Sequence, residues 1–314
     1  MAIKKGQWVD QDTGDILYPQ TSADMVVQDS GNRFVTDAEK ENWNNIQKDN
    51  ILINADFRQN AINQRNSTTY GAVSSWTYSI DRWMYFGQMS VTKGDDCVTL
   101  QANSSNSGSS YFKQFIENRL NGTYTLYINV LEVSGNVQIL IDGGIALKKG
   151  ENIITFTTPS SGYSGLQINL TGTSAKLIIS HMKLEQGTKF TGMPVWDRTL
   201  ELSKCFRYFF RIHNLSKHYY FNAVWGAVDT ASGYIQLPVM MRTTPTVSFA
   251  GLYLVKTSDG AWKSVQKITD VGYGSGQVQF VCTVPSGSLQ SIADLRGLVQ
   301  SVSTAYLAFD AEIY

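Results

Sequence analysis

The strict alternation of apolar and polar residues in several segments constrains the fold of this chain more than any other feature. Segments 124–130, 166–170 and 278–284 each place apolar side chains at every second position. A period of two is typical of a β-strand with one buried face. Such segments recur about every ten residues with turn residues between them, so the sequence predicts an all-β protein built of antiparallel sandwiches.

Two breaks in the alternation divide the chain. Before residue 50 the segment is too small to bury a core of its own, and Thr36 and Glu39 have the spacing of a capping box that starts a short helix. Leu202, Cys205 and Phe209 recur at helical spacing. We therefore expect an attachment segment with a short helix at 1–49, a jelly-roll-like β-sandwich at 50–192, a short helical joint at 193–212 and a C-terminal β-sandwich at 213–314.

Charge and cysteine content exclude several functional classes. The chain has 26 Lys and Arg against 26 Asp and Glu, whereas a nucleic-acid-binding protein normally carries a basic excess. Its 3 cysteines are widely spaced, so neither a disulfide scaffold nor a structural zinc site is expected. Because the sequence has no signal peptide and no apolar stretch long enough for a membrane span, we expect synthesis in the cytoplasm, release by lysis and no membrane insertion.

The usual patterns of catalytic residues are missing. Gly-x-Ser-x-Gly, Ser-x-x-Lys and His-Glu-x-x-His do not occur. A glycosidase would need two carboxylates at a defined separation. Asp95 and Asp96 are adjacent and would point to opposite sides of an extended chain, and we expect Asp310 and Glu312 to lie on a solvated strand face. The protein is therefore predicted not to be an enzyme and to use no cofactor.

Three stretches carry motifs in a characteristic order. They are VVQDSGNRFVTDAEKENWN at Val26–Asn44, NILINADFRQNAINQR with YSIDRWMY between Asn50 and Tyr85, and KLEQGTKFTGMPVWDRTLELSKCFRYFFRI at Lys183–Ile212. Together they resemble segments of bacteriophage tail-fibre and receptor-binding proteins, mainly from phages of Gram-positive bacteria. The second stretch is similar to the opening of a carbohydrate-binding-module-like domain, and the third to the joint that follows such a domain.

The resemblance implies a homotrimeric fibre or tip on a virion. Residues 1–49 would bind a phage tail or baseplate protein, and the β domains would bind a polysaccharide of the host cell surface. A phage-tail-like bacteriocin would have the same parts. Related sugar-binding sandwiches often hold a structural calcium between their first and last strands. Asp56 could be one ligand, but His181 stands where an acidic ligand would be expected, so we predict no metal site.

Sugar recognition needs aromatic faces beside polar groups, and two tryptophans are the main candidates. Trp262 follows the turn-rich segment 257–260, so we expect it near a loop end of the C-terminal domain. Trp76 lies in a loop-like Ser-Ser-Trp-Thr segment of the first sandwich. The predicted carbohydrate-binding residues are Trp262, Asp259, Tyr253 and Lys263, with Trp76 as the rival platform.

The Asp81-Arg82-Trp83 motif is assigned to structure rather than to binding. Trp83 is expected in the core, with Arg82 paired to Asp81 or to the backbone. The sequence as a whole thus predicts a non-enzymatic receptor-binding protein that mediates adsorption to a host glycan. Two alternatives stay open: a glycan-cleaving, tailspike-like depolymerase, and a purely structural fibre spacer that binds no host surface.

Overall fold

The chain divides into two compact units, Met1–Ile46 and Gln47–Tyr314. The computed structural model describes residues 8–9, 16–17, 46–141, 143–213, 219–227, 229–256, 261–286, 295–299 and 304–313. In the first unit, β1 (Trp8–Val9) pairs with β2 (Ile16–Leu17) in antiparallel orientation. The helix expected after Thr36 lies outside the described residues.

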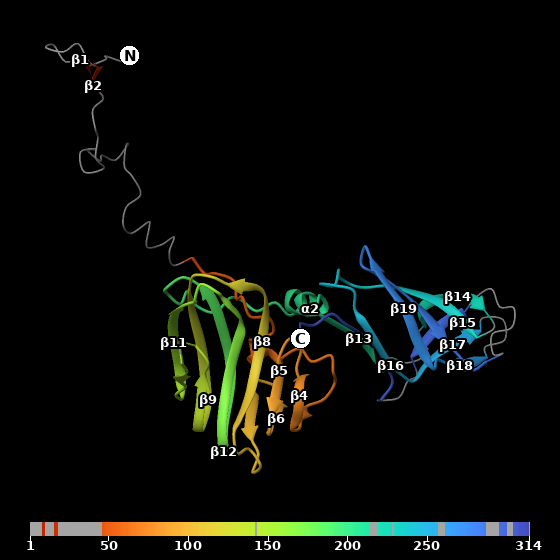
Figure 1. The fold of residues 1–314 in the computed structure, drawn as a ribbon, viewed down its shortest axis with the longest axis horizontal. Coiled ribbons are helices and arrows are strands. Elements are labelled where there is room, and N and C mark those ends of the chain that lie inside the picture. Colours follow the sequence, from red (N-terminus) through yellow and green to blue (C-terminus); the bar gives the residue numbers. More distant parts are fainter. Residues whose placement is uncertain are drawn as a thin grey trace. The chain divides into compact units, whose positions relative to one another are not determined.

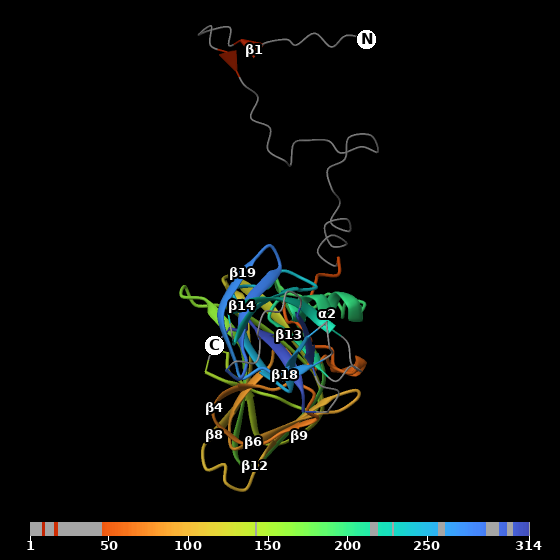
Figure 2. The same ribbon diagram turned by 90° about the vertical axis from the view of Figure 1, so that its right-hand side faces the viewer.

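The first sandwich is a single ten-stranded antiparallel sheet that curls over on itself (Figures 1 and 2). Its two longest strands, β9 and β12, run through both layers, because one part of β12 pairs with β8 and another part with β7. One layer therefore contains β4, β5 and β8, and the other contains β3, β6 and β7. The strands are β3 (Thr69–Tyr70), β4 (Val73–Tyr78), β5 (Met84–Gly87), β6 (Met89–Lys93), β7 (Val98–Ala102), β8 (Ser109–Leu120), β9 (Thr123–Ile139), β10 (Ile145–Ala146), β11 (Gly150–Thr157) and β12 (Tyr163–Gln186), preceded by a 3-10 turn, η2 (Phe57–Gln59).

Glycines form the corner between the two layers. The pairing of β12 with β9 shifts register between Thr171 and Lys176. At this corner Gly172 and Gly135 have φ of +86° and +69°, a left-handed conformation that glycine adopts at little cost. A Cβ at Gly135 would lie 2.9 Å from the Ala175 Cα, so the strands approach too closely for a side chain. These glycines allow both strands to turn from one layer into the other.

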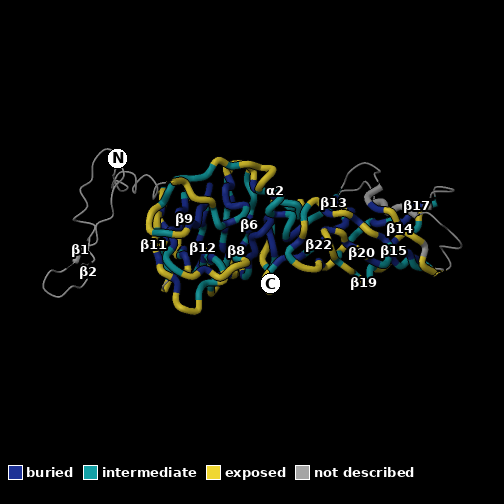
Figure 3. Tube along the Cα trace, turned by 90° about the horizontal axis from the view of Figure 1, so that it is seen from above, coloured by how far each residue is buried: buried dark blue, intermediate teal, exposed yellow. Residues whose placement is uncertain are grey.

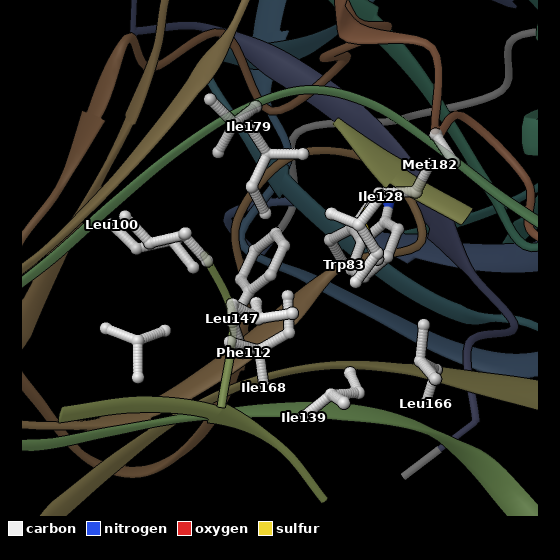
Figure 4. Close-up of a cluster of buried hydrophobic side chains, with 14 of the residues drawn as sticks. Trp83, Leu100, Phe112, Ile128, Ile139, Leu147, Leu166, Ile168, Ile179 and Met182 are labelled. Carbon is white, nitrogen blue, oxygen red and sulfur yellow. The ribbon is translucent and has the colours of Figure 1, made fainter. Parts of the chain in front are cut away.

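Buried residues recur along the strands of the sandwich (Figure 3), and the apolar side chains of the alternating segments fill the space between its layers (Figure 4). Trp83 is fully buried, and its ring stacks on Phe112 at a centroid distance of 4.7 Å. Its indole Nε1 donates a hydrogen bond to the Asn54 carbonyl at 2.9 Å, so the polar end of the ring is also satisfied. The all-β fold and the core position of Trp83 are therefore confirmed.

The outer face of β9 is also buried over part of its length, which the alternation does not predict. The segment that follows β12 folds back over this face, and Phe190 stacks on Tyr127 at a centroid distance of 4.1 Å. The buried Lys183 ammonium donates to the Gly192 carbonyl at 2.7 Å and pairs with Glu185 at 3.1 Å. The segment after β12 therefore serves as a cover for the sandwich.

The C-terminal region forms a second sandwich of two antiparallel sheets. One has the order β13-β22-β16 and the other the order β18-β17-β21-β14-β15-β20-β19. Phe280 of the larger sheet contacts Phe309 of the smaller one at a centroid distance of 6.4 Å, so the sheets pack face to face. The strands are β13 (Phe209–His213), β14 (Tyr219–Ala227), β15 (Thr230–Gln236), β16 (Thr246–Ala250), β17 (Leu252–Lys256), β18 (Trp262–Ser264), β19 (Lys267–Gly274), β20 (Gln277–Thr283), β21 (Leu295–Val299) and β22 (Tyr306–Asp310).

A short helix, α2 (Arg198–Phe206), leads from the first sandwich into β13. The Asp197 side chain caps this helix by accepting hydrogen bonds from the backbone N–H groups of Thr199 and Leu200 at 2.8 and 3.1 Å. Cys205, in the last turn of this helix, is buried. The helical spacing in the sequence predicted this helix correctly, although Phe209 already belongs to strand β13.

A buried ion pair connects the first sandwich to the end of the chain. Arg82 is fully buried and pairs with Glu312, which follows β22. The Arg82 guanidinium also donates to the Phe115 carbonyl at 2.7 Å and lies 3.5 Å from the centroid of the Tyr208 ring. The expectation of a solvated Glu312 is therefore wrong. The backbone contact of Arg82 is as expected, but its acidic partner is Glu312 rather than Asp81.

A second arginine extends this cluster. Arg65 lies 3.3 Å from an Asp81 oxygen and 3.5 Å from a Glu312 oxygen. Gln64 donates to Asp81 at 2.6 Å and to the Phe209 carbonyl at 2.7 Å. Burial raises the pKa of Asp81 to about 6, although Arg65 and Gln64 act in the opposite direction. We refer to Arg65, Asp81, Arg82 and Glu312 as the joint cluster.

Candidate functional site

Three aromatic rings from neighbouring strands meet on the outer face of the first sandwich. The Trp76 ring of β4 lies 5.6 Å from Phe86 of β5 and 6.0 Å from Tyr111 of β8, between centroids. Phe86 and Tyr111 are 6.2 Å apart, and the angles between the three ring planes are 21–36°. Trp76 is 39% exposed, so solvent reaches one end of this continuous aromatic surface. We call it the aromatic cluster.

Burial alternates along β8, and this alternation puts Tyr111 on the outer face of the sheet. Phe112 and Gln114 are buried, whereas Tyr111, Lys113 and Phe115 lie half-buried on the opposite face. Phe86 is directly opposite Tyr111 in the β5–β8 ladder, and the two rings therefore meet as a cross-strand pair. β4 forms the edge of the layer, which leaves its tryptophan partly uncovered.

A lysine lies against the aromatic cluster. Lys113 Nζ is 3.7 Å from the centroid of the Phe115 ring and 5.9 Å from that of Trp76, so its charge faces aromatic rings. Partial burial lowers the pKa of Lys113 from its ordinary value. No carboxylate in the described part of the chain pairs with it. A ligand with an acidic group would supply the missing partner.

Amide side chains border the cluster on β12. Gln167 is opposite Lys113 and Asn169 is opposite Tyr111 in the β8–β12 ladder. The Asn169 Oδ1 atom is buried and accepts no hydrogen bond from any described residue. A buried acceptor without a partner is destabilising, and a hydroxyl donor from a ligand would relieve that cost.

The arrangement combines the groups that bind sugars. An exposed indole can stack against the C–H groups of a pyranose ring, while amides and an ammonium form hydrogen bonds with its hydroxyl and acidic substituents. These groups come from adjacent strands of one sheet, so the fold rather than a mobile loop holds their spacing. The cluster is therefore suited to recognition of a saccharide surface.

The structure brings together two of the four residues predicted for the C-terminal site. Trp262 begins β18 at the edge of the larger sheet, is 45% exposed, and its ring lies 5.6 Å from that of Tyr253. Lys263 is opposite Leu254 in the ladder and therefore points to the other face of the strand from Trp262. Asp259 lies outside the described residues.

Sequence reasoning misplaced Trp76 and missed its neighbours. Trp76 lies within strand β4 rather than in a loop. Phe86, Tyr111 and Lys113 were not singled out, although a usable signal was present: aromatic residues occupy both faces of the segment 111–115. A strand that has aromatic side chains in both phases must place some of them on its outer face, where they can meet a ligand.

Asp56, the residue considered as a calcium ligand, is occupied by an arginine. Asp56 forms a β-bridge with His181, which brings the start of the sandwich next to its last strand. Arg58 donates to both Asp56 carboxylate oxygens, at 2.8 and 2.6 Å. Among the residues that the structure describes, no group of three or more His, Cys, Asp or Glu could hold a metal ion.

No described helix is both long and apolar enough to cross a membrane.

Comparisons with known proteins give little further information. The sequence matches no protein-family model and, at a significant level, no curated protein. Among solved structures, the chain is similar to a conserved protein of unknown function from Pseudomonas aeruginosa, with 11% sequence identity over 70% of this chain and 91% of that one. The TM-score of that match is 0.14, which is too low to bear on either fold or function.

Proposed function

We propose that this chain is a bacteriophage tail-fibre or receptor-binding protein that recognises a host cell-surface glycan without cleaving it, and that the aromatic cluster holds the glycan. The observation that carries the proposal is the partly exposed Trp76 ring, which is continuous with Phe86 and Tyr111 on one sheet face. The order of the three tail-fibre-like motifs supports the biological setting.

The charge of the site narrows the class of glycan. Lys113 offers an ammonium that no described carboxylate pairs with, beside the Asn169 acceptor that no described donor reaches. A saccharide that carries a phosphate or carboxylate would form a charge-assisted hydrogen bond with Lys113 while a hydroxyl donates to Asn169. We therefore expect an acidic cell-wall polysaccharide. Several weak sites on a homotrimer would increase the overall strength of adsorption by avidity.

The test is binding of the fluorescently labelled full-length chain to cell walls from a panel of Gram-positive bacteria. Binding should be saturable on at least one wall and should disappear after periodate oxidation of its vicinal diols. Trp76→Ala should weaken binding by about tenfold or more, equivalent to ~1.4 kcal/mol, because the stacking surface is lost. The thermal transition should change little, because the Trp76 side chain is partly exposed.

Trp262→Ala is the matched control, because it removes a tryptophan of similar exposure, 45% against 39%, from the other sandwich. It should bind as the wild type does. The reverse result, with loss of binding only in Trp262→Ala, would move the site to the C-terminal domain. Release of oligosaccharide from the walls would establish a depolymerase. Failure of the chain to bind any wall would favour a structural spacer.

A further inference from the structure

The second sandwich has an uncharged hollow on the outer face of its larger sheet. The hollow has a volume of about 510 Å³ and lies where β15, β20 and the edge strand β19 run side by side. We call it the glutamine hollow. Its lining consists of Gln236, Gly272, Tyr273, Gly274, Ser275, Gln277 and Gln279.

Two glycines of β19 create this hollow. Gly274 is opposite Gln277, and Gly272 is opposite Gln279. A Cβ at either glycine would have no atom within 4 Å, so the missing side chains leave open space. Neither glycine has a positive φ, which means that the backbone itself does not require glycine. The absence of side chains therefore leaves the glutamines of β20 uncovered along the edge of the sheet.

Two glutamines of β20 offer their amides to a ligand, whereas Gln236 donates to the Gly276 carbonyl at 3.2 Å and the Tyr273 hydroxyl forms hydrogen bonds with the Met241 backbone. Gln277 and Gln279 are exposed, and neither side chain forms a hydrogen bond with any residue that the structure describes. Tyr234 is opposite Gln279 on β15 and is 43% exposed, so an aromatic ring lies beside the amides. An amide presents a donor and an acceptor together, which matches a sugar hydroxyl that donates and accepts at once.

We propose that the glutamine hollow is a second carbohydrate-binding site, specific for a neutral glycan segment. No residue of its lining carries a charge, so an ionised group would lose water without finding a counter-charge there. This preference is opposite to that expected from Lys113 at the aromatic cluster. The hollow consists of residues of the second sandwich. Its proposed role therefore does not depend on the proposed function of the aromatic cluster.

The experiment is a titration of the isotope-labelled full-length chain, followed by the side-chain amide resonances of Gln277 and Gln279. Maltotriose and chitotriose serve as neutral probes, and trigalacturonate serves as the acidic probe. Neutral sugar should shift these resonances in a saturable way, with a dissociation constant of about 1 mM. The acidic probe should leave them unchanged. Trp76→Ala should give the wild-type result, which separates this site from the aromatic cluster.

Gly274→Val fills the hollow without disturbing the backbone and should weaken neutral-sugar binding by about tenfold or more. Gly71→Val is the matched control, since Gly71 is also exposed, lacks a positive φ and has open space at its Cβ position. Gln279→Ala should also weaken neutral-sugar binding. It serves as the test if Gly274→Val fails to fold. The proposal is wrong if neither neutral sugar shifts the amides, or if Gly274→Val binds normally. It is also wrong if the only effect of Gly274→Val is on the mass measured by light scattering, because the hollow would then be an interface between copies.

Discussion

Glu312→Gln tests whether the joint cluster stabilises the connection between the two sandwiches. The Glu312 carboxylate is completely buried and is the counter-charge of Arg82, which is itself 1% exposed. The substitution keeps the shape of the side chain and removes only its charge. The buried Arg82 guanidinium would then lose its acidic partner, and Arg65 would keep only the carboxylate of Asp81.

The size of the effect follows from this burial. Removing one partner of a buried ion pair generally costs about 3–5 kcal/mol, because the other charge stays desolvated without its partner. We expect the lower end, about 3 kcal/mol, since Arg82 keeps the Phe115 carbonyl and the Tyr208 ring, and the new amide oxygen can still accept a hydrogen bond. For a protein of this size, that corresponds to a fall in melting temperature of about 5 °C.

Urea unfolding followed by tryptophan fluorescence, together with scanning calorimetry, measures this loss. Glu132→Gln is the matched control, because Glu132 forms an ion pair with Lys176 at 2.8 Å on the surface, with side-chain exposures of 50% and 29%. Its cost should stay below about 1 kcal/mol. Combining Glu312→Met with Arg82→Met should cost less than the sum of the single changes, because no unpaired charge remains. Equal costs for Glu312→Gln and Glu132→Gln would refute the reasoning.

Two further predictions concern pH and assembly. Because the pKa of Asp81 is raised from 3.8 to about 6 in the folded chain, its contribution to stability is complete below pH 3.8 and is lost as the pH rises through 6. The difference in unfolding free energy between the wild type and Asp81→Asn should therefore change by about 3 kcal/mol across that window, and a flat difference would contradict the assignment. Light scattering of the intact chain should give three times 34.9 kDa, whereas a monomer mass would exclude the expected homotrimer.

Alternation in the sequence was sufficient to predict the strands but not what covers their outer faces. Leu166, Ile168 and Leu170 are buried as the pattern predicts. Tyr127 belongs to the polar phase of its strand but is buried, because Phe190 lies against it. A period of two identifies the face that meets the core, whereas a distant segment that returns over the other face leaves no local periodic signal.

The candidate site shows the same limit. The sequence predicted Trp76 as a rival platform, but its neighbours Phe86 and Tyr111 lie on other strands. Their meeting depends on the β4–β5–β8 ladder. Turn lengths and register determine this ladder, and neither can be read from any one segment.

Glu312 was misjudged for a related reason. Its place in the polar phase of an alternating segment predicts solvent exposure, whereas its burial depends on Arg82, which lies 230 residues away in sequence.

The joint cluster also bears on how two glycan sites on one chain would act together. Linked binding sites strengthen each other only when one polymer can reach both, and a flexible linker spreads the second site over a large volume. Here the connection is held at several points: Arg82 pairs with Glu312, Gln64 donates to the Phe209 carbonyl at 2.7 Å, and Arg211 donates to the Arg65 carbonyl at 2.8 Å. A connection fixed by buried contacts would make the joint gain depend on the spacing of acidic and neutral segments in the polysaccharide. Specificity would then arise from the order of sugars along the polymer as well as from the chemistry of each site.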